Sequence, residues 1–169
     1  PALRRAVLEK DFARMNDRQK QAVFTVNGPL LILAGAGSGK TTVLINRIAN
    51  ILRYGDAYNS TYLCDDLDEN DIAACKAYIE NGTPLTTESQ EHLSVSACAP
   101  WRIMAITFTN KAAGELKDRL CAMLGETAND IWASTFHSTC ARILRRDGEH
   151  IGYSSHFTVY DTDDQRRLM

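Results

Sequence analysis

The sequence predicts an α/β fold in which helices cover both faces of a parallel sheet. Three short apolar segments are typical of buried strands, and a stretch with apolar residues at helical spacing follows each of them. The strand–helix pairs are 30–33 with 42–52, 101–109 with 110–124, and 131–135 with 138–146. Repeated units of this kind build parallel sheets, because the helix returns the chain to the edge where the strand began.

An acidic segment, residues 56–100, interrupts this pattern between the first and second units. Apolar spacing within it predicts one helix over 69–80 and another over 87–97. We therefore expect one domain formed by 1–55 and 101–169, with residues 56–100 as a mostly helical insertion.

Length and composition are those of a single-domain globular protein. At 169 residues the chain can bury roughly two-thirds of its unfolded surface. Its five cysteines form no Cys-x-x-Cys pair and leave an odd thiol, which favours a reducing compartment over a disulfide framework. The sequence shows no secretory leader and no apolar run of the roughly 20 residues that cross a bilayer. We expect a cytoplasmic protein with no membrane partner.

Charge is unevenly distributed along the chain. Residues 1–55 hold nine Lys and Arg against three Asp and Glu (+6), residues 56–100 hold one against nine (−8), and residues 101–169 hold nine of each. The net charge of −2 therefore gives no indication of nucleic acid by itself. The acidic insertion is expected to be a solvated appendage, or else a docking surface for a protein partner, at the sheet edge opposite the ligands.

The most informative motif is a glycine-rich loop between the first predicted strand and its helix, Ala34-Gly35-Ala36-Gly37-Ser38-Gly39-Lys40-Thr41. Glycines let backbone N–H groups turn toward phosphate oxygens, and the amino end of the following helix favours anions. Lys40 would reach the β- and γ-phosphates, and the Thr41 hydroxyl would complete the coordination of a Mg²⁺ ion. Ala34 stands where the usual motif has glycine, so the match is to its looser form. The loop predicts a nucleotide site.

Upstream of the loop, Asn16-Asp17-Arg18-Gln19 has the form of a capping box. Asn16 would cap a helix, and Gln19, three residues on, would reach back to the backbone of the cap. The motif predicts a helix that precedes the first strand in the chain.

Four blocks now occur in order, and together they resemble the N-terminal part of superfamily 1 DNA helicases of the UvrD/Rep/PcrA type. The blocks are residues 15–23, 34–41, 106–113 and 134–138, and residues 157–165 resemble the segment that such helicases carry next. The string Thr-Phe-Thr-Asn-Lys-Ala-Ala over 107–113 is the most specific, because few other phosphate-loop proteins contain it. The resemblance covers 12–53 and 101–169 and leaves out the acidic insertion. It implies a RecA-like P-loop NTPase fold that is incomplete in this chain.

The resemblance also implies roles at the nucleotide site. The Gln19 amide would read the adenine edge and so select ATP, since it can both donate and accept hydrogen bonds. Thr42 stands where the family commonly has an arginine that contacts the nucleotide, which implies weaker binding. Lys40 and Thr41 would be the catalytic residues, Thr41 would face Mg²⁺, and the residues around ATP would be Gln19, Ala34, Gly35, Ala36, Gly37, Ser38, Gly39, Lys40, Thr41 and Thr42.

Two further strand–helix junctions are implied to grip single-stranded DNA. Both follow the carboxyl ends of predicted strands, the edge where open parallel sheets place their ligands. Aromatic rings can stack bases, and hydroxyl, amide and amine groups can hold phosphates. His137 has no cysteine or acidic neighbour at ligand spacing, so a metal role is not expected. The residues implied are Thr107, Phe108, Thr109, Asn110, Lys111, Thr135, Phe136 and His137.

The end of the sequence lacks a feature that ATP hydrolysis requires. The acids at 161–164 fit a capped helix start, because no apolar strand ending in Asp-Glu precedes them. Phosphoryl transfer needs a carboxylate and arginines that the four blocks do not supply. We therefore expect a parent enzyme that uses ATP to translocate on single-stranded DNA, 3′ to 5′, and to unwind duplex at junctions, and an isolated chain with negligible ATP hydrolysis.

Other functions remain open from the sequence alone. A helicase subunit of a nuclease-coupled recombination enzyme would share these blocks. A small-molecule kinase or a non-catalytic nucleotide-binding module would share the phosphate loop, but has no need of the block at 107–113. Binding to single-stranded DNA separates the helicases from the other two classes.

Overall fold

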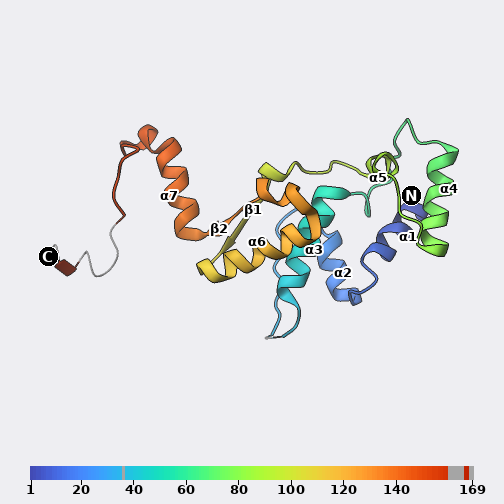
Figure 1. Cartoon of the computed structure of the whole chain (residues 1–169), viewed down its shortest axis with the longest axis horizontal. Helices are drawn as coiled ribbons and strands as arrows, with labels where there is room; N and C mark the ends of the chain where they lie inside the picture. Colours follow the sequence, from blue (N-terminus) through green and yellow to red (C-terminus); the bar gives the residue numbers. More distant parts are fainter. Residues whose placement is uncertain (36, 160–165, 168–169) are drawn as a thin grey trace.

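The computed structural model describes residues 1–35, 37–159 and 166–167. In these ranges it is an elongated molecule, with α1, α4 and α5 at one end and α7 at the other (Figure 1). The helices are α1 (Ala2–Asp11), α2 (Asp17–Phe24), α3 (Lys40–Arg53), α4 (Glu69–Asn81), α5 (Thr87–Leu93), α6 (Asn110–Leu124) and α7 (Phe136–Asp147). The strands are β1 (Met104–Thr107) and β2 (Trp132–Thr135), and short 3₁₀ turns cover Pro100–Arg102, Gly125–Asp130 and Gly148–Ile151.

The predicted α/β class is confirmed in its coarse form: helices accompany a parallel pair, β1 and β2, in which Met104 lies opposite Trp132 and Thr107 opposite Thr135, while a RecA-like fold stays a prediction. Helix α6 connects the strands and covers one face, where Ala105 is buried. Successive side chains alternate between faces, and on the other face Met104 and Ile106 are 44% and 46% exposed. Cover on both faces is therefore not found for this sheet in the described residues.

The predicted strand at residues 30–33 is wrong. This segment is irregular, and its side chains are exposed, with Leu31 at 81% and Leu33 at 87%. A strand needs a neighbour for its N–H and C=O groups. Among the described residues only β1 and β2 form a sheet, so an apolar run alone was not sufficient evidence for a strand.

Two other predicted elements are shorter in the structure. Of the strand predicted over 101–109, only β1 is a strand. A 3₁₀ turn that begins at Pro100 takes up the first predicted residues, Trp101 and Arg102. The helix predicted over 87–97 ends at Leu93, because the backbone of Val95 is extended and pairs with Tyr54 and Asp56.

Other local predictions are confirmed. Asn16 and Gln19 form the capping box of α2 with both of its hydrogen bonds present. Helix α6 has the predicted bounds, and α4 follows the prediction to within one residue. Helix α1 was not predicted, and the acids at 161–164 lie outside the described residues.

Two hydrophobic cores lie on either side of α3. The helical core gathers buried residues from α1, α2, α4 and α5, and the sheet core gathers them from β1, α6 and the turn before β2. Helix α3 contributes Val43 to the helical core and Ile45 and Ile48 to the sheet core. The helical core includes Val7, Leu8, Phe12, Val23, Phe24, Tyr54, Cys75 and Leu93; the sheet core includes Ala105, Leu116, Leu120, Ala128 and Ile131.

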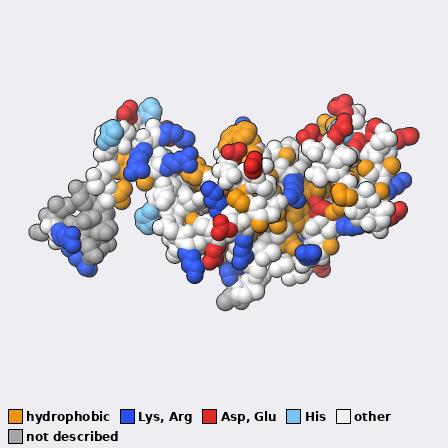
Figure 2. All heavy atoms as spheres, viewed as in Figure 1, with side chains coloured by type: hydrophobic (Ala, Val, Ile, Leu, Met, Phe, Trp, Pro, Cys, Tyr) orange, Lys and Arg blue, Asp and Glu red, His pale blue; other side chains and the backbone are white. Residues whose placement is uncertain are grey.

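The acidic insertion is packed into the helical core and is not a solvated appendage. Ala57, Cys75 and Leu93 are buried there, and the Tyr58 ring stacks on Phe24 with centroids 3.9 Å apart. Acidic side chains gather on the surface over the end of the molecule that holds α4 (Figure 2). The sequence did not reveal this packing, because the buried apolar positions of the insertion are few and widely spaced among the acids.

Basic residues of α1 meet backbone carbonyls of the insertion. Arg4 is 3% exposed and donates to the carbonyls of Tyr62, at 2.7 Å, and Ser60, at 2.5 Å. Lys10 donates to the last carbonyls of α4, those of Tyr78 at 2.6 Å and Ile79 at 2.8 Å. A cation at a helix carboxyl end also complements the helix dipole. The basic and acidic segments therefore meet mainly through guanidinium and ammonium groups on carbonyl oxygens.

The two ends of the insertion lie side by side. Asp56 donates its N–H to the Val95 carbonyl at 2.8 Å, and Val95 donates to the Tyr54 carbonyl at 3.0 Å. Gly55 has a φ of 58°, and a Cβ there would lie 2.1 Å from the Val95 oxygen. Glycine is required at this position, since it both ends α3 and lets the returning chain approach.

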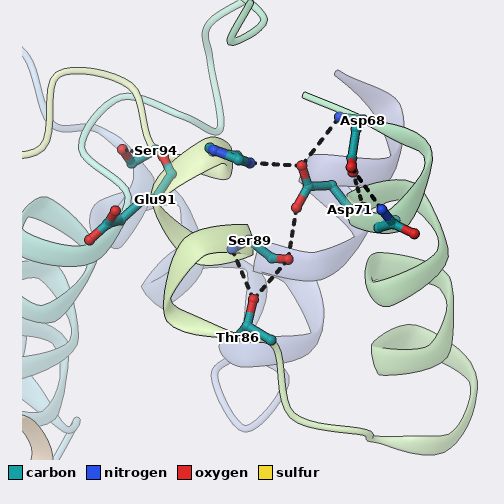
Figure 3. Close-up of polar contacts among 8 residues, drawn as sticks. Asp68, Asp71, Thr86, Ser89, Glu91 and Ser94 are labelled. Carbon is teal, nitrogen blue, oxygen red and sulfur yellow. Dashed lines mark hydrogen bonds and ion pairs between the residues drawn. The ribbon is translucent and has the colours of Figure 1, made fainter. Parts of the chain in front are cut away.

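A polar network joins α4 to α5 inside the insertion (Figure 3). Asp71 is 6% exposed, and its carboxylate accepts from the Ser89 hydroxyl at 2.7 Å and lies 2.7 Å from His92 Nδ1. Asp68 and Asp71 also cap α4 reciprocally. A buried carboxylate costs free energy unless it is hydrogen-bonded, and here its hydrogen bonds fix α5 against α4.

No helix in the described part of the chain combines the length and apolar character needed to span a bilayer. All five cysteines are unpaired.

Candidate nucleotide and nucleic-acid site

The glycine-rich loop connects residues 30–33 to the first turn of α3, and its own side chains donate hydrogen bonds to its backbone carbonyls. Gly37 and Gly39 have φ angles of 73° and 81°, which favour glycine. The Ser38 hydroxyl donates to the Gly35 carbonyl at 2.7 Å. Ala36 lies outside the described residues.

The Lys40 amine folds back over this loop. It donates to the carbonyls of Gly35, at 2.5 Å, and Ala34, at 3.1 Å. These carbonyls hold the cation where the turn could also receive an anion. A Cβ at Gly35 or Gly37 would meet no atom within 4 Å, so the backbone of the loop is open to a ligand. The residues present therefore fit a phosphate group.

Gln19 connects α2 to the loop. Its Oε1 accepts from the Asn16 N–H at 3.1 Å, and its Nε2 donates to the Ser38 carbonyl at 3.2 Å. A Cβ at position 39 would lie 3.0 Å from Nε2, so Gly39 allows this approach. The capping role and the contact with the loop use different atoms of one amide. Contact with adenine stays a prediction, and would require the amide to exchange one of these bonds.

A hollow of 250 Å³ lies beside the loop. Gln19, Ala34, Ser38 and Lys40 line it together with apolar side chains, which suits a flat ring bearing a charged tail. The sequence singled out those four as site residues, but missed the other lining residues, Asn16, Arg18, Ala22, Ile32, Leu33 and Val43. The adjacency of Arg18 to Gln19 was the available signal for one of them.

Thr41 and Thr42 do not line this hollow. Both are exposed, and the Thr42 carbonyl accepts from the Asn46 side chain at 2.8 Å. The described residues bring together no group of three His, Cys, Asp or Glu. A Mg²⁺ ion at Thr41 would therefore take its other non-water ligands from the nucleotide phosphates.

The two strand–helix junctions lie next to each other at the carboxyl edge of the sheet, where Thr107 and Thr135 are paired. The exposed side chains there are aromatic, amide, imidazole and amine groups. Phe108 is 98% exposed and Phe136 55%, with the Phe136 and His137 rings 6.0 Å apart in an edge-to-face contact. Asn110 and Lys111, in the first turn of α6, are exposed as well.

The threonines at these junctions are already hydrogen-bonded. Thr109 and Thr135 cap α6 and α7, accepting from the N–H groups of Ala112 at 3.1 Å and Ser138 at 3.3 Å. Thr135 is also buried. The Thr107 hydroxyl donates to the Thr109 carbonyl at 3.1 Å. These threonines therefore set the geometry of the edge, and the exposed neighbours are free to contact a ligand.

The loop and this edge come from helices that pack on each other. Helices α3 and α6 share the sheet core through Ile45, Ile48, Leu116 and Leu120. A common sheet edge for the two sites stays a prediction, since no described strand leads into the loop.

Comparison with known proteins identifies the family. The UvrD/REP helicase N-terminal domain matches residues 15–64 and 83–169, and the unmatched residues 65–82 lie in the insertion. The chain is 44% identical over 156 residues to the ATP-dependent DNA helicase PcrA of Leuconostoc citreum, which covers 92% of the chain and 15% of the relative. It is 42% identical over 151 residues to the Bacillus subtilis PcrA, covering 89% and 15%, and 41% identical over 155 residues to the Staphylococcus aureus PcrA, covering 92% and 16%. The chain thus spans about 15% of the length of these relatives. It belongs to the UvrD/REP helicase family, through the N-terminal domain.

Proposed function

We propose that the chain binds ATP for an ATP-dependent DNA helicase that moves 3′ to 5′ on single-stranded DNA and opens duplex at junctions. The observation that supports this most is the Lys40 amine held over a turn built on two left-handed glycines, beside a hollow that Gln19 lines. The family assignment favours a helicase over a kinase or a separate nucleotide-sensing module. A cytoplasmic location is part of the proposal and agrees with five unpaired cysteines.

At the loop, the chain's own groups would bind and orient the triphosphate. Lys40 would exchange its two carbonyl acceptors for phosphate oxygens, which are charged and therefore better acceptors. The Thr41 hydroxyl would take one position on Mg²⁺, and the ion would neutralise charge on the β- and γ-phosphates. Gln19 would orient the adenine, and a RecA-like arrangement would place the adenine against α2.

At the carboxyl edge of the sheet, Phe108 and the Phe136–His137 pair would stack unpaired bases, and Lys111 would contact the backbone. Stacking does not depend on base identity, which suits a translocating enzyme. The chain itself should hydrolyse ATP negligibly, because phosphoryl transfer needs a carboxylate and arginines that the four sequence blocks do not supply.

Binding of a fluorescent ATP analogue with Mg²⁺ tests the nucleotide site. Lys40→Ala should weaken binding by roughly 10- to 100-fold, since it removes a charged hydrogen-bond donor from the phosphates. Lys117→Ala, an exposed lysine on α6, removes the same charge away from the loop and should leave affinity unchanged. Equal affinity of Lys40→Ala and the native chain would refute the proposed site. Phosphate release that oligo-dT stimulates and Lys40→Ala abolishes would refute the expected lack of hydrolysis.

A further inference from the structure

A wide groove lies at the opposite edge of the sheet from Phe108, where the strands begin. It has a volume of 880 Å³, within the roughly 300–1,000 Å³ of ligand clefts. It is bounded by the 3₁₀ turns around the sheet and by one side of α7. Its lining includes Trp101, Trp132, Asp130, Arg142, Arg145 and Arg146.

The arginines of this groove differ in their partners. Arg146 pairs with Asp147 at 2.7 Å. The Arg142 guanidinium lies 4.6 Å from the centre of the Trp132 ring, and Arg145 lies 5.7 Å from that of Phe157. Neither Arg142 nor Arg145 has an ion pair with a carboxylate in the part of the chain that the structure describes. Figure 2 shows basic side chains gathered over α7. The groove therefore offers two guanidinium groups to an anion, with Asp130 as the acidic group in its lining.

Trp101 adds an aromatic surface to these cations. It lies in the 3₁₀ turn Pro100–Arg102 and is 70% exposed. Trp132 begins β2, opposite the first residue of β1, so its ring belongs to the amino edge of the sheet. The strands are four residues long, which separates this groove from the Thr107–Thr135 edge by about 10 Å of backbone. The groove is thus a different surface from the one the sequence indicated.

We propose that this groove is a second binding site for single-stranded DNA, in which Trp101 stacks on a base and Arg142 and Arg145 contact phosphates. Duplex DNA keeps its base faces stacked, so the exposed ring favours an unpaired strand. An acidic peptide would meet the arginines, but it would need an aromatic side chain beside its acids to stack on Trp101, whereas every nucleotide of single-stranded DNA carries both a phosphate and a base. The choice of DNA as the polyanion depends on the proposed function; the position and chemistry of the groove do not.

The experiment uses the whole chain and two readouts of oligo-dT binding. Anisotropy of a labelled oligonucleotide reports binding anywhere. Intrinsic tryptophan fluorescence reports this groove, because the chain has only two tryptophans and both line it. Arg142→Ala with Arg145→Ala should lower the magnitude of the salt dependence, log K against log salt, by about 1.4. Trp101→Ala should weaken binding about 10-fold. The matched charge control is Arg14→Ala with Lys76→Ala, two exposed residues of the helical half, which is the part of the chain packed around the helical core.

The outcomes separate this proposal from the proposed function. Three results together support the groove. Oligo-dT should quench tryptophan fluorescence in Phe108→Ala as in the native chain, a matched duplex should not quench it, and the Arg142/Arg145 variant should lose the quenching. Binding by anisotropy without tryptophan quenching, and with the Arg142/Arg145 variant equal to the Arg14/Lys76 control, overturns the groove and leaves the carboxyl edge as the DNA site. Equal quenching by polyglutamate shows an acidic-peptide surface and overturns the DNA assignment. No binding in either readout overturns both sites.

Discussion

The helical core and the sheet core are built to different degrees of closure. Around the helical core, hydrogen bonds pair the Tyr54 hydroxyl with Asp11 at 2.5 Å and the Asp71 carboxylate with Ser89 at 2.7 Å. In the sheet core, one face of β1 packs on α6 and the other is exposed, and Phe108 at the end of the strand has almost no cover. The two cores share α3, so the difference in how completely they are covered lies in how many elements surround each.

This difference bears on the candidate sites. The candidate DNA residues, such as Phe108 and Lys111, are exposed beside the sheet core, whereas the nucleotide hollow is lined in part by Ala22 and Val43 of the helical core. The helical half includes the insertion, part of which falls outside the family match. We infer that the helical half holds α2 and α3, and hence the loop between them, in place. Arg47 of α3 contributes directly, donating to the Ala22 carbonyl at 2.7 Å.

Removing the insertion should have the largest effect on this comparison. Residues 57–94 can be replaced by two glycines, because Asp56 and Val95 are hydrogen-bonded neighbours. The deletion exposes Leu8 and Phe24, and we expect the helical half to lose its cooperative unfolding, as measured by urea denaturation and hydrogen exchange.

A second variant separates loss of the insertion from a poor connection. Two glycines inserted after Asn81, where α4 already ends, lengthen the insertion without removing its core residues and should leave the urea midpoint unchanged. If the deleted chain unfolds at the native urea concentration, the insertion is an appendage after all, and the helical core does not depend on it.

Sequence patterns predicted elements whose signals are local. The capping box at Asn16 and the bounds of α6 follow from residues three or four positions apart, and both are confirmed. Residues 30–33 show the limit of this approach, because pairing in a sheet depends on segments distant in the chain. The same limit applies to the candidate sites. The glycine turn could be predicted from the sequence, whereas the groove between Trp101 and Arg142 could not, because it depends on how α7 lies against β2.

Truncation of one leucine in each core should have the next largest effect. Leu8 and Leu120 are both fully buried, so Leu8→Ala and Leu120→Ala should each lower the free energy of unfolding by about 2–5 kcal/mol. Hydrogen exchange should distinguish them. Leu120→Ala should speed exchange in β1 and α6 while α1 and α4 stay protected, since each core can open locally. Leu8→Ala should show the reverse pattern.

Leu33→Ala is the matched control for these two substitutions. Leu33 is 87% exposed, and the same change there should alter the free energy of unfolding by no more than about 0.5 kcal/mol. Uniform acceleration of exchange across α1, α4, β1 and α6 in either core variant would show one cooperative unit and contradict the division into two cores.

The smallest effect expected is a pH dependence confined to the helical half. The hydrogen bond to Asp71 raises the pKa of His92 above its usual 6.5, although partial burial opposes this. Burial pushes the pKa of Asp71 up, but its hydrogen bonds to His92, Ser89 and the Asp68 backbone outweigh burial and leave that pKa below 3.8. The stabilisation from His92 is therefore complete below about pH 6.5 and is lost as pH rises through its raised pKa. The stabilisation from Asp71 is present above about pH 3.8 and is lost as pH falls through its lowered pKa.

The pair should therefore stabilise the fold most between about pH 4 and 6.5. Urea midpoints measured from pH 6 to 8 should fall more steeply for the native chain than for His92→Gln, which keeps a polar group but cannot titrate. Protection of the α4 and α5 amides should decline over the same range, while protection in β1 and α6 should not. Parallel midpoint curves for the two chains would show that the ion pair contributes nothing to the closure of the helical core, and that apolar packing by residues such as Cys75 and Leu93 is sufficient.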